Sequence, residues 1–116
     1  MKQSPVFART HDLLLWLIPQ TMKFPRSQRF VLAKRVQDAA LDFQEHLLEA
    51  GLSKESVRIE RMDQADVALA KLRSYLRLCH DMQLLSLGQY EHVSRMVAEV
   101  GRLLGGWYQS ETDTAE

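Results

Sequence analysis

The sequence predicts an all-α protein that folds as an antiparallel, up-down-up-down four-helix bundle. Hydrophobic residues recur at alternating steps of three and four along most of the 116-residue chain, which places them on one face of a helix. Helix-breaking and helix-capping residues separate four such segments. The connections are short, and short connections force neighbouring helices to run antiparallel. We expect one domain, a four-helix bundle over residues 1–108, followed by a disordered acidic tail over residues 109–116.

The first helix is expected over residues 5–24. Its pattern is the least regular of the four, because a second apolar row widens the hydrophobic stripe. The shared face consists of Val6, Thr10, Leu13, Leu17 and Phe24, with Phe7, Leu14 and Ile18 beside it. Pro25 is expected to end this helix, since the residue before a proline is disfavoured in the helical region.

Three further helices are expected over about residues 27–50, 53–85 and 87–108. Each contains a hydrophobic seam, a row of residues at alternating helical steps without a gap. The seams are Ala33, Val36, Ala40, Phe43, Leu47 and Ala50; then Met62, Ala65, Leu69, Leu72, Leu76 and Cys79; then Tyr90, Val93, Val97, Val100, Leu104 and Trp107. Because such rows are buried where helices pack, the three seams predict the core.

Local signals mark two of the connections. Gly51 is expected to end the second helix in a left-handed conformation, and Ser53 to accept hydrogen bonds from the free amides of the third. Ser86 and Gln89 have the spacing of a capping box, in which each side chain accepts a hydrogen bond from the other residue's backbone amide. The fourth helix should therefore start beside Ser86.

Composition excludes several classes of protein. The longest unbroken apolar run, Leu13 to Ile18, is much shorter than the ~20 residues that a membrane helix needs, so no membrane partner is expected. Charged residues interrupt the apolar stretch near the N-terminus, which does not fit a secretory signal. The single cysteine, Cys79, cannot form an internal disulfide. These features predict a cytoplasmic protein.

Catalytic and metal-binding patterns are weak, so we expect neither enzymatic activity nor a cofactor. The four histidines lie on four different segments, and none forms a His-x-x-x-His pair. Cys79, His80 and Asp81 are consecutive, but consecutive helical residues point about 100° apart and do not face one another. Cys79 lies on a seam, which favours a small buried apolar residue over a nucleophile. The pair of His80 and Asp81 remains open as a buried polar or helix-packing pair.

Basic residues cluster at two places, although the formal net charge of the chain is zero. The first cluster is Arg26, Arg29, Lys34 and Arg35, and the second is Arg73 and Arg77, which Lys71 joins on the same expected helix. Such clusters bind phosphates in nucleic-acid-binding proteins. The alternative is a solvated helix face with local ion pairs to Asp38, Asp42 or Asp81, which composition alone favours.

Large apolar residues also lie outside the seams. They are Trp16, Tyr108, Leu41, Leu48, Leu78, Leu84, Leu87 and Leu103, and Trp107 ends the last seam. Two interpretations fit them: a core wider than the seams, or an exposed apolar surface used in self-association.

Three strings of residues resemble a known family. They are Lys23–Phe30 (KFPRSQRF), Leu76–Ser86 (LRLCHDMQLLS) and Val100–Trp107 (VGRLLGGW). Together they look like the Avd family, the accessory variability determinant proteins of diversity-generating retroelements, and are close to the Bordetella phage type. The resemblance runs from about Pro5 to Tyr108. The family also resembles the four-helix proteins encoded in 23S ribosomal RNA intervening sequences.

The resemblance implies a homopentameric barrel of four-helix protomers without an active site. Such a protein binds the element's reverse transcriptase and its template RNA or cDNA, and supports the mutagenic cDNA synthesis and retrohoming that diversify a target gene. Well-studied members are strongly basic, whereas this chain is neutral, so contact with nucleic acid is expected only where basic residues cluster. The expected contact residues are Arg26, Arg29, Lys34, Arg35, Arg58, Arg61, Arg73 and Arg77.

An alternative function stays open at this stage. A structural oligomer of the 23S ribosomal RNA intervening-sequence type would have the same bundle but no polymerase partner. The genomic neighbourhood separates the two, because only a retroelement places a reverse transcriptase gene and near-identical template and variable repeats beside it.

Overall fold

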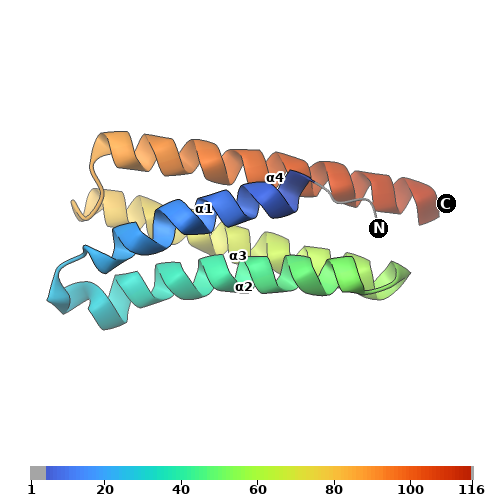
Figure 1. Ribbon diagram of the computed structural model, residues 1–116, viewed down its shortest axis with the longest axis horizontal. Helices are drawn as coiled ribbons and strands as arrows, with labels where there is room; N and C mark the ends of the chain where they lie inside the picture. The colour runs from blue at the N-terminus through green and yellow to red at the C-terminus, as the bar shows by residue number, and fades with distance from the viewer. Residues whose placement is uncertain (1–4, 116) are drawn as a thin grey trace.

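Four helices lie side by side as an antiparallel bundle in the computed structural model, which describes residues 5–115 and the side chains of residues 5–113 (Figure 1). The four are α1 (Pro5–Met22), α2 (Lys34–Leu52), α3 (Glu55–Asp81) and α4 (Leu87–Ala115), and two short helical turns, η1 (Arg26–Gln28) and η2 (Arg29–Ala33), precede α2. No strand occurs in this part of the chain. The predicted all-α four-helix bundle is therefore confirmed.

Each helix packs against two neighbours. α2 and α3 make the most extensive contact, and α1 and α4 complete the bundle by packing against each other and against α2 and α3 respectively. The α1–α2 and α3–α4 connections lie at one end of the bundle, and the α2–α3 connection lies at the other end with the C-terminal part of α4 (Figure 1). This up-down-up-down order follows from the short connections.

The three predicted seams form the core. Every residue of the seams on α2 and α3, including Ala33 just before α2, is at most 3% exposed. On α4 the three valines and Leu104 are buried, while Tyr90 and Trp107 are half-buried at the rim. α1 contributes Val6, Leu13 and Leu17. Burial of these side chains is the main favourable free energy of folding.

In the α3–α4 connection, the sequence correctly predicts the start of α4 but not the end of α3. The backbone amide of Ser86 donates to Gln89 Oε1 at 2.9 Å, and the amide of Gln89 donates to Ser86 Oγ at 3.1 Å, so the predicted capping box is confirmed. The third helix, however, ends at Asp81 and not at residue 85. Gln83 has a left-handed φ of 63°, and the amides of Gln83 and Leu84 donate to the carbonyls of His80 and Cys79. This is a Schellman motif with glutamine where glycine is usual.

The connection between α2 and α3 differs from the prediction. Gly51 is helical and has no positive φ, and α2 continues to Leu52. Ser53 does not cap α3, because its hydroxyl donates to the carbonyl of Glu49 at 2.6 Å. α3 begins at Glu55, after Lys54 in an extended conformation and without a side-chain cap. An arginine also donates to carbonyls at this end of α2, among them that of Ala50, which already accepts from the amide of Ser53.

Three further boundaries differ from the prediction. The segment before Lys34, expected to belong to a regular helix from residue 27, consists of the 3-10 turn η1 and the π-helical turn η2. The first helix ends at Met22, with Phe24 outside it. Residues 109–115, expected as a disordered tail, continue α4. Side-chain bonds one turn apart hold that extension, among them Gln109 Nε2 to Asp113 Oδ1 at 2.8 Å. Residue 116 lies outside the described residues.

Candidate interaction surfaces

The eight predicted contact residues lie in three places and do not form one surface. They are Arg26, Arg29, Lys34 and Arg35 where α1 joins α2; Arg73 and Arg77 in the second half of α3; and Arg58 and Arg61 near the start of α3. Because α3 begins at the end of the bundle opposite the α1–α2 connection, Arg58 and Arg61 lie far from the first group (Figure 1).

We call the segment Lys23–Arg35 the basic end. Arg26, Arg29 and Arg35 are exposed and form no ion pair with any described residue, whereas Lys34 Nζ lies 2.6 Å from Asp38 Oδ2. Arg26 and Arg29 have no acidic residue near them in the sequence, because none occurs between Asp12 and Asp38. Asp38, three residues after Arg35, pairs with Lys34. The guanidinium groups of the three arginines are thus free to bind phosphate or carboxylate groups of a partner.

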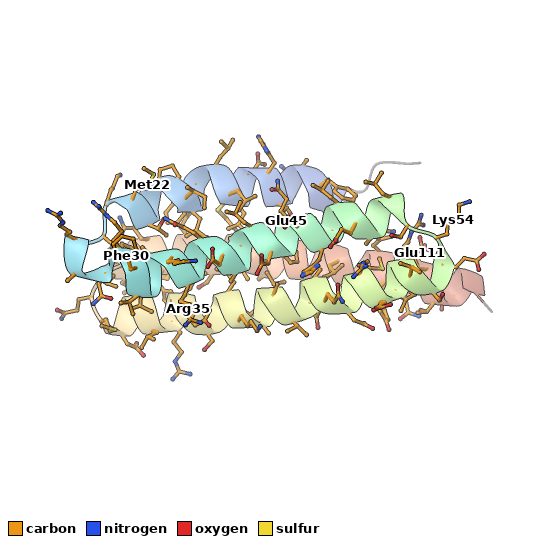
Figure 2. All side chains as sticks on the ribbon, turned by 90° about the horizontal axis from the view of Figure 1, so that it is seen from below. Met22, Phe30, Arg35, Glu45, Lys54 and Glu111 are labelled. Carbon is orange, nitrogen blue, oxygen red and sulfur yellow. The ribbon has the colours of Figure 1, made fainter. Side chains whose placement is uncertain are left out.

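Two residues of the basic end were missed in the sequence. Lys23 is exposed, and Phe30, in the π-helical turn, is 79% exposed. Phe30 and Arg35 lie at the same end of the face formed by α2 and α3, with Lys54 and Glu111 at the opposite end (Figure 2). The long stretch without acidic residues was the available signal for Lys23. No periodic pattern marks Phe30, because a π-helical turn breaks the helical repeat.

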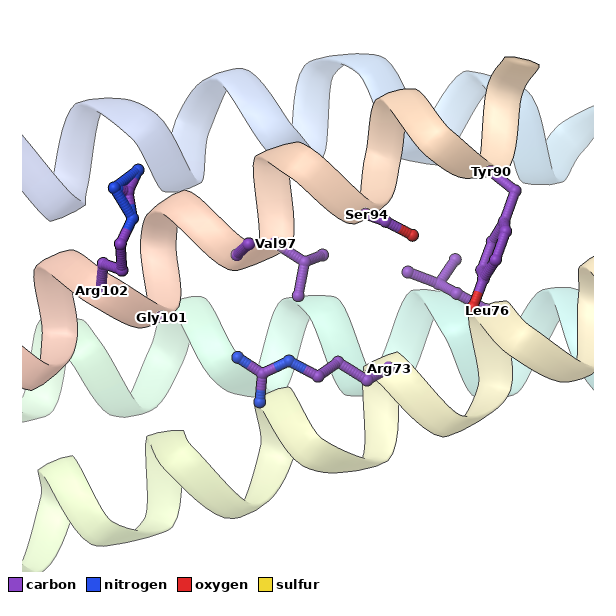
Figure 3. A pocket seen from close by; sticks show the side chains of 8 residues that line it. Arg73, Leu76, Tyr90, Ser94, Val97, Gly101 and Arg102 are labelled. Carbon is purple, nitrogen blue, oxygen red and sulfur yellow. The ribbon is translucent and has the colours of Figure 1, made fainter. Parts of the chain in front are cut away.

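The two arginines of α3 have different surroundings. Arg73 extends from α3 toward Gly101 along a groove of about 440 Å³ between α3 and α4, lined also by Tyr90, Ser94 and Val97 (Figure 3). A Cβ at position 101 would lie 2.6 Å from Arg73 Nη2, so glycine at this position makes room for the guanidinium group. The side chain of Arg77 is 78% exposed, and its Nε lies 4.0 Å from Asp81 Oδ2. That distance and exposure make a weak ion pair.

At the opposite end, the side chain of Arg58 is occupied within the bundle. Its Nε donates to the carbonyls of Ala50 and Ser53, both at 3.1 Å, and its Nη2 donates to Ser53 at 2.8 Å. Its Nη1 lies 2.8 Å from Glu111 Oε1, which also accepts from Trp107 Nε1 at 3.2 Å. We call this network the clasp. It satisfies carbonyls at the end of α2 and anchors the C-terminal extension of α4.

The clasp leaves few cations at that end of the molecule for a partner. Arg61 donates to Gln64 Oε1 on the next turn at 3.0 Å and is half-buried, and Lys54 is exposed. The acidic Glu49, Glu55 and Glu60 are exposed around them. A polyanion is therefore attracted less strongly to this end than to the basic end.

The consecutive Cys79, His80 and Asp81 do not assemble into a catalytic group. Cys79 is buried, and burial raises the pKa of its thiol from the ordinary 9.0 to about 11, which opposes formation of the reactive thiolate. His80 stacks on Tyr90 with ring centroids 4.7 Å apart, and Asp81 is exposed. Within the described residues, no three or more His, Cys, Asp or Glu side chains are grouped so as to hold a metal ion.

The apolar residues outside the seams divide between core and surface. Trp16, Leu84, Leu103, Trp107 and Tyr108 are half-buried and pack against the core, so the core is wider than the seams. Leu41, Leu48, Leu78 and Leu87 are exposed by 40 to 61%. Leu41, Leu48 and Leu52 lie on one face of α2 and form an exposed, mostly apolar stripe, with the exposed Glu45 between Leu41 and Leu48. None of the helices in residues 5–115 is long and apolar enough to cross a membrane.

Comparisons with known proteins agree with this architecture. A family model described as bAvd-like matches residues 6–111, which is most of the chain. Among solved structures, a protein of unknown function from the S23 ribosomal protein family of Bacteroides thetaiotaomicron has the same fold. The TM-score is 0.83 at 16% sequence identity, covering 90% of this chain and 95% of that one. The search of curated proteins gives no match.

Proposed function

Because the chain belongs to the bAvd-like family, we propose that it is the accessory protein of a diversity-generating retroelement. In this role it binds the element's reverse transcriptase and template RNA in the cytoplasm and supports mutagenic cDNA synthesis and retrohoming. The polymerase carries out the chemistry, and the bundle supplies binding surfaces. The earlier resemblance to the Avd family is thereby confirmed at the level of the family.

Support for the binding role comes mainly from one observation, the unpaired cations of the basic end. Arg26, Arg29 and Arg35 are exposed and form no ion pair with a described residue, although Arg35 lines a groove together with Asp38 and Asp42, in a protein whose net charge is zero. A partner can bind these cations without breaking an ion pair inside the protein. Each contact with a phosphate also releases counterions from the nucleic acid, which favours binding. Arg73 and Arg77, in the half of α3 nearer to this end, extend the proposed contact surface. Arg58 and Arg61 are left out of it.

A homopentamer is the proposed assembly, as the family resemblance implies. The exposed stripe of Leu41, Leu48 and Leu52 supplies apolar surface of the kind that protomers bury against one another. Five copies repeat the basic end five times, so that weak phosphate contacts on one RNA reinforce one another through effective concentration. Light scattering of the purified protein should give five times the mass of one chain.

The alternative is a structural oligomer of the 23S ribosomal RNA intervening-sequence type. The fold agrees with this possibility as well, because the solved structure of the S23 ribosomal protein family has the same bundle. A bundle that serves only as a structural oligomer gives no reason for a cluster of exposed, unpaired arginines, whereas a polyanionic partner does. We therefore retain the retroelement function as the main proposal.

Co-expression with the reverse transcriptase encoded beside the gene tests this proposal. The expected result is a stable complex that copurifies with template RNA. A matched sample in which the polymerase is replaced by an unrelated RNA-binding protein controls for capture through RNA alone. If neither polymerase nor RNA copurifies with the folded protein, or if the gene lies within a ribosomal RNA insertion, the proposed function is wrong.

A further inference from the structure

A groove next to the basic end has an unusual combination of side chains. It lies between the start of α2 and α3 and has a volume of about 430 Å³, which falls in the ~300–1,000 Å³ range of small-ligand sites. Two aromatic residues, Phe30 and Tyr75, and three cations line it, together with Ala39 and two carboxylates; the charged residues are Lys34, Arg35, Lys71, Asp38 and Asp42. Aromatic side chains among cations are the feature shared by sites for single-stranded nucleic acid.

Phe30 is the residue that core packing does not explain. At 79% exposure, most of its ring is open to solvent, although Leu32 and Ala33 in the same π-helical turn are buried. The ring is flanked along the chain by Arg29 and, one turn later, by Lys34. An exposed aromatic face beside cations can stack on a nucleobase while the cations contact the adjoining phosphates.

The two carboxylates decide which part of a nucleotide fits the groove. Asp38 pairs with Lys34 at 2.6 Å, and Asp42 lies one turn further along α2. These carboxylates offset much of the positive charge of the three cations that line the groove, so the groove attracts a phosphate group less than the unpaired Arg26 and Arg29 do. A nucleobase carries no charge, and its amino groups can donate hydrogen bonds to a carboxylate. Phosphates are better placed on the exposed Arg26 and Arg29, which do not line the groove.

From these observations we propose that the groove beside Phe30 binds an unstacked base of a single-stranded nucleic acid, with the flanking phosphates on the arginines of the basic end. The inference rests on the proposed function and narrows it, because it names the form of nucleic acid that this surface selects. Bases in a duplex are stacked and paired and cannot reach Phe30, so duplex RNA is bound only through its phosphates. The surface therefore discriminates single strands from duplexes without reading sequence.

Binding of two RNA forms by the full-length protein tests the proposal. The probes are a labelled single-stranded RNA of about 12 nucleotides and the duplex that it forms with its complement, measured by fluorescence anisotropy. Phe30→Leu keeps an exposed apolar side chain but removes the aromatic ring. Val57→Ala changes another exposed apolar residue, at 45%, near the start of α3 at the opposite end of the bundle. Circular dichroism checks that both variants keep the helical content of the parent.

The expected result is that Phe30→Leu raises the Kd for the single strand about tenfold and leaves the Kd for the duplex within about twofold. Val57→Ala should leave both unchanged. Equal loss for both RNA forms, or no loss for either, overturns the proposal. Loss of polymerase copurification by Phe30→Leu with unchanged RNA affinity also overturns it and assigns the surface to protein docking. In each of these cases the proposed function stands if reversing the charge of Arg26 and Arg29 still weakens RNA binding, so the two failures are distinguishable.

Discussion

The two ends of the bundle use arginine in opposite ways. At the basic end, Arg26 and Arg29 are exposed and have no carboxylate beside them. At the other end, the side chain of Arg58 is only 22% exposed, and its guanidinium group binds two backbone carbonyls and Glu111. The residue type is the same at both ends, but only Arg58 has carbonyl and carboxylate oxygens of the described residues within hydrogen-bonding distance. A count of basic residues therefore does not locate a binding surface, whereas the distribution of their partners does.

The difference has a cause in the sequence. Acidic residues are absent between Asp12 and Asp38, and the chain ends in Glu111, Asp113 and Glu116. Folding brings Glu111 beside Arg58, because α4 runs back to the end of the bundle where α3 begins (Figure 2). The antiparallel topology thus neutralises one end of the molecule and leaves the other end positive.

The largest effect is expected from reversing charge at the basic end. Arg26→Glu with Arg29→Glu should weaken RNA binding by about 100-fold or more and reduce the slope of log Kd against log salt by about 2, because two phosphate contacts are lost and become repulsive. Lys54→Glu with Arg61→Glu makes the same change in net charge at the other end and should alter Kd by less than about threefold. Equal losses in the two variants would remove the distinction between the ends.

A smaller effect, on stability, is expected at the clasp. Arg58→Ala should lower the free energy of unfolding by about 2 kcal/mol, because it leaves carbonyls and the Glu111 carboxylate without a charged donor. Amide hydrogens of residues 109–113 should exchange faster, and RNA affinity should not change. Arg9→Ala is the control, because Arg9 bonds Asp12 and Glu99 through side chains that are 42 to 54% exposed. Arg9→Ala should lower the free energy of unfolding, measured in urea, by less than about 0.5 kcal/mol.

The arginines of α3 lie between the two ends, and we expect a loss of binding of intermediate size when their charge is reversed. Arg73→Glu with Arg77→Glu should weaken RNA or polymerase association about tenfold, a change of about 1.4 kcal/mol, with unchanged helicity by circular dichroism. The expected loss is below that at the basic end because the Arg73 side chain lies along the α3–α4 groove. Unchanged copurification together with an unchanged RNA gel shift would show that neither residue contacts a partner.

The smallest effect tests whether the stability of the α3–α4 connection, which lies at the same end of the bundle as the basic end, can change without a change in RNA binding. Gln83 holds a left-handed φ of 63° in the α3–α4 connection, a conformation that glycine adopts without a Cβ penalty. Gln83→Gly should raise the free energy of unfolding by about 0.5–1 kcal/mol and leave RNA affinity unchanged. Met82→Gly, at an ordinary φ of −89°, should lower it by a similar amount. Opposite signs for the neighbouring substitutions would verify the strain at Gln83.

The fold was largely predictable because its determinants are local in the sequence. The seam from Ala33 to Ala50 and that from Met62 to Cys79 are buried throughout, and the capping box of Ser86 and Gln89 forms as its spacing indicates. The end of α3 was not predictable from residue types, because a glutamine takes the position where glycine is the usual signal. The helical residues 109–115 were missed because the partner of Glu111 is Arg58, on another helix.

The candidate surface was predictable only in part. The sequence identified the basic residues, but it could not distinguish Arg58 from Arg26. Whether an arginine pairs within the protein or stays exposed depends on contacts that form only on folding. Phe30 was missed for a different reason. Its exposure results from the π-helical turn before α2, and a turn of that kind leaves no hydrophobic period to recognise.

The central claim is that the basic end, and not the end with the clasp, contacts nucleic acid. Ultraviolet cross-linking of the full-length protein to a single-stranded RNA, followed by mass spectrometry of the peptides, tests this directly. We expect cross-links within residues 23–35 and at Tyr75. Cross-links concentrated in residues 54–61 or 107–113, or spread evenly over the four helices, would contradict the claim.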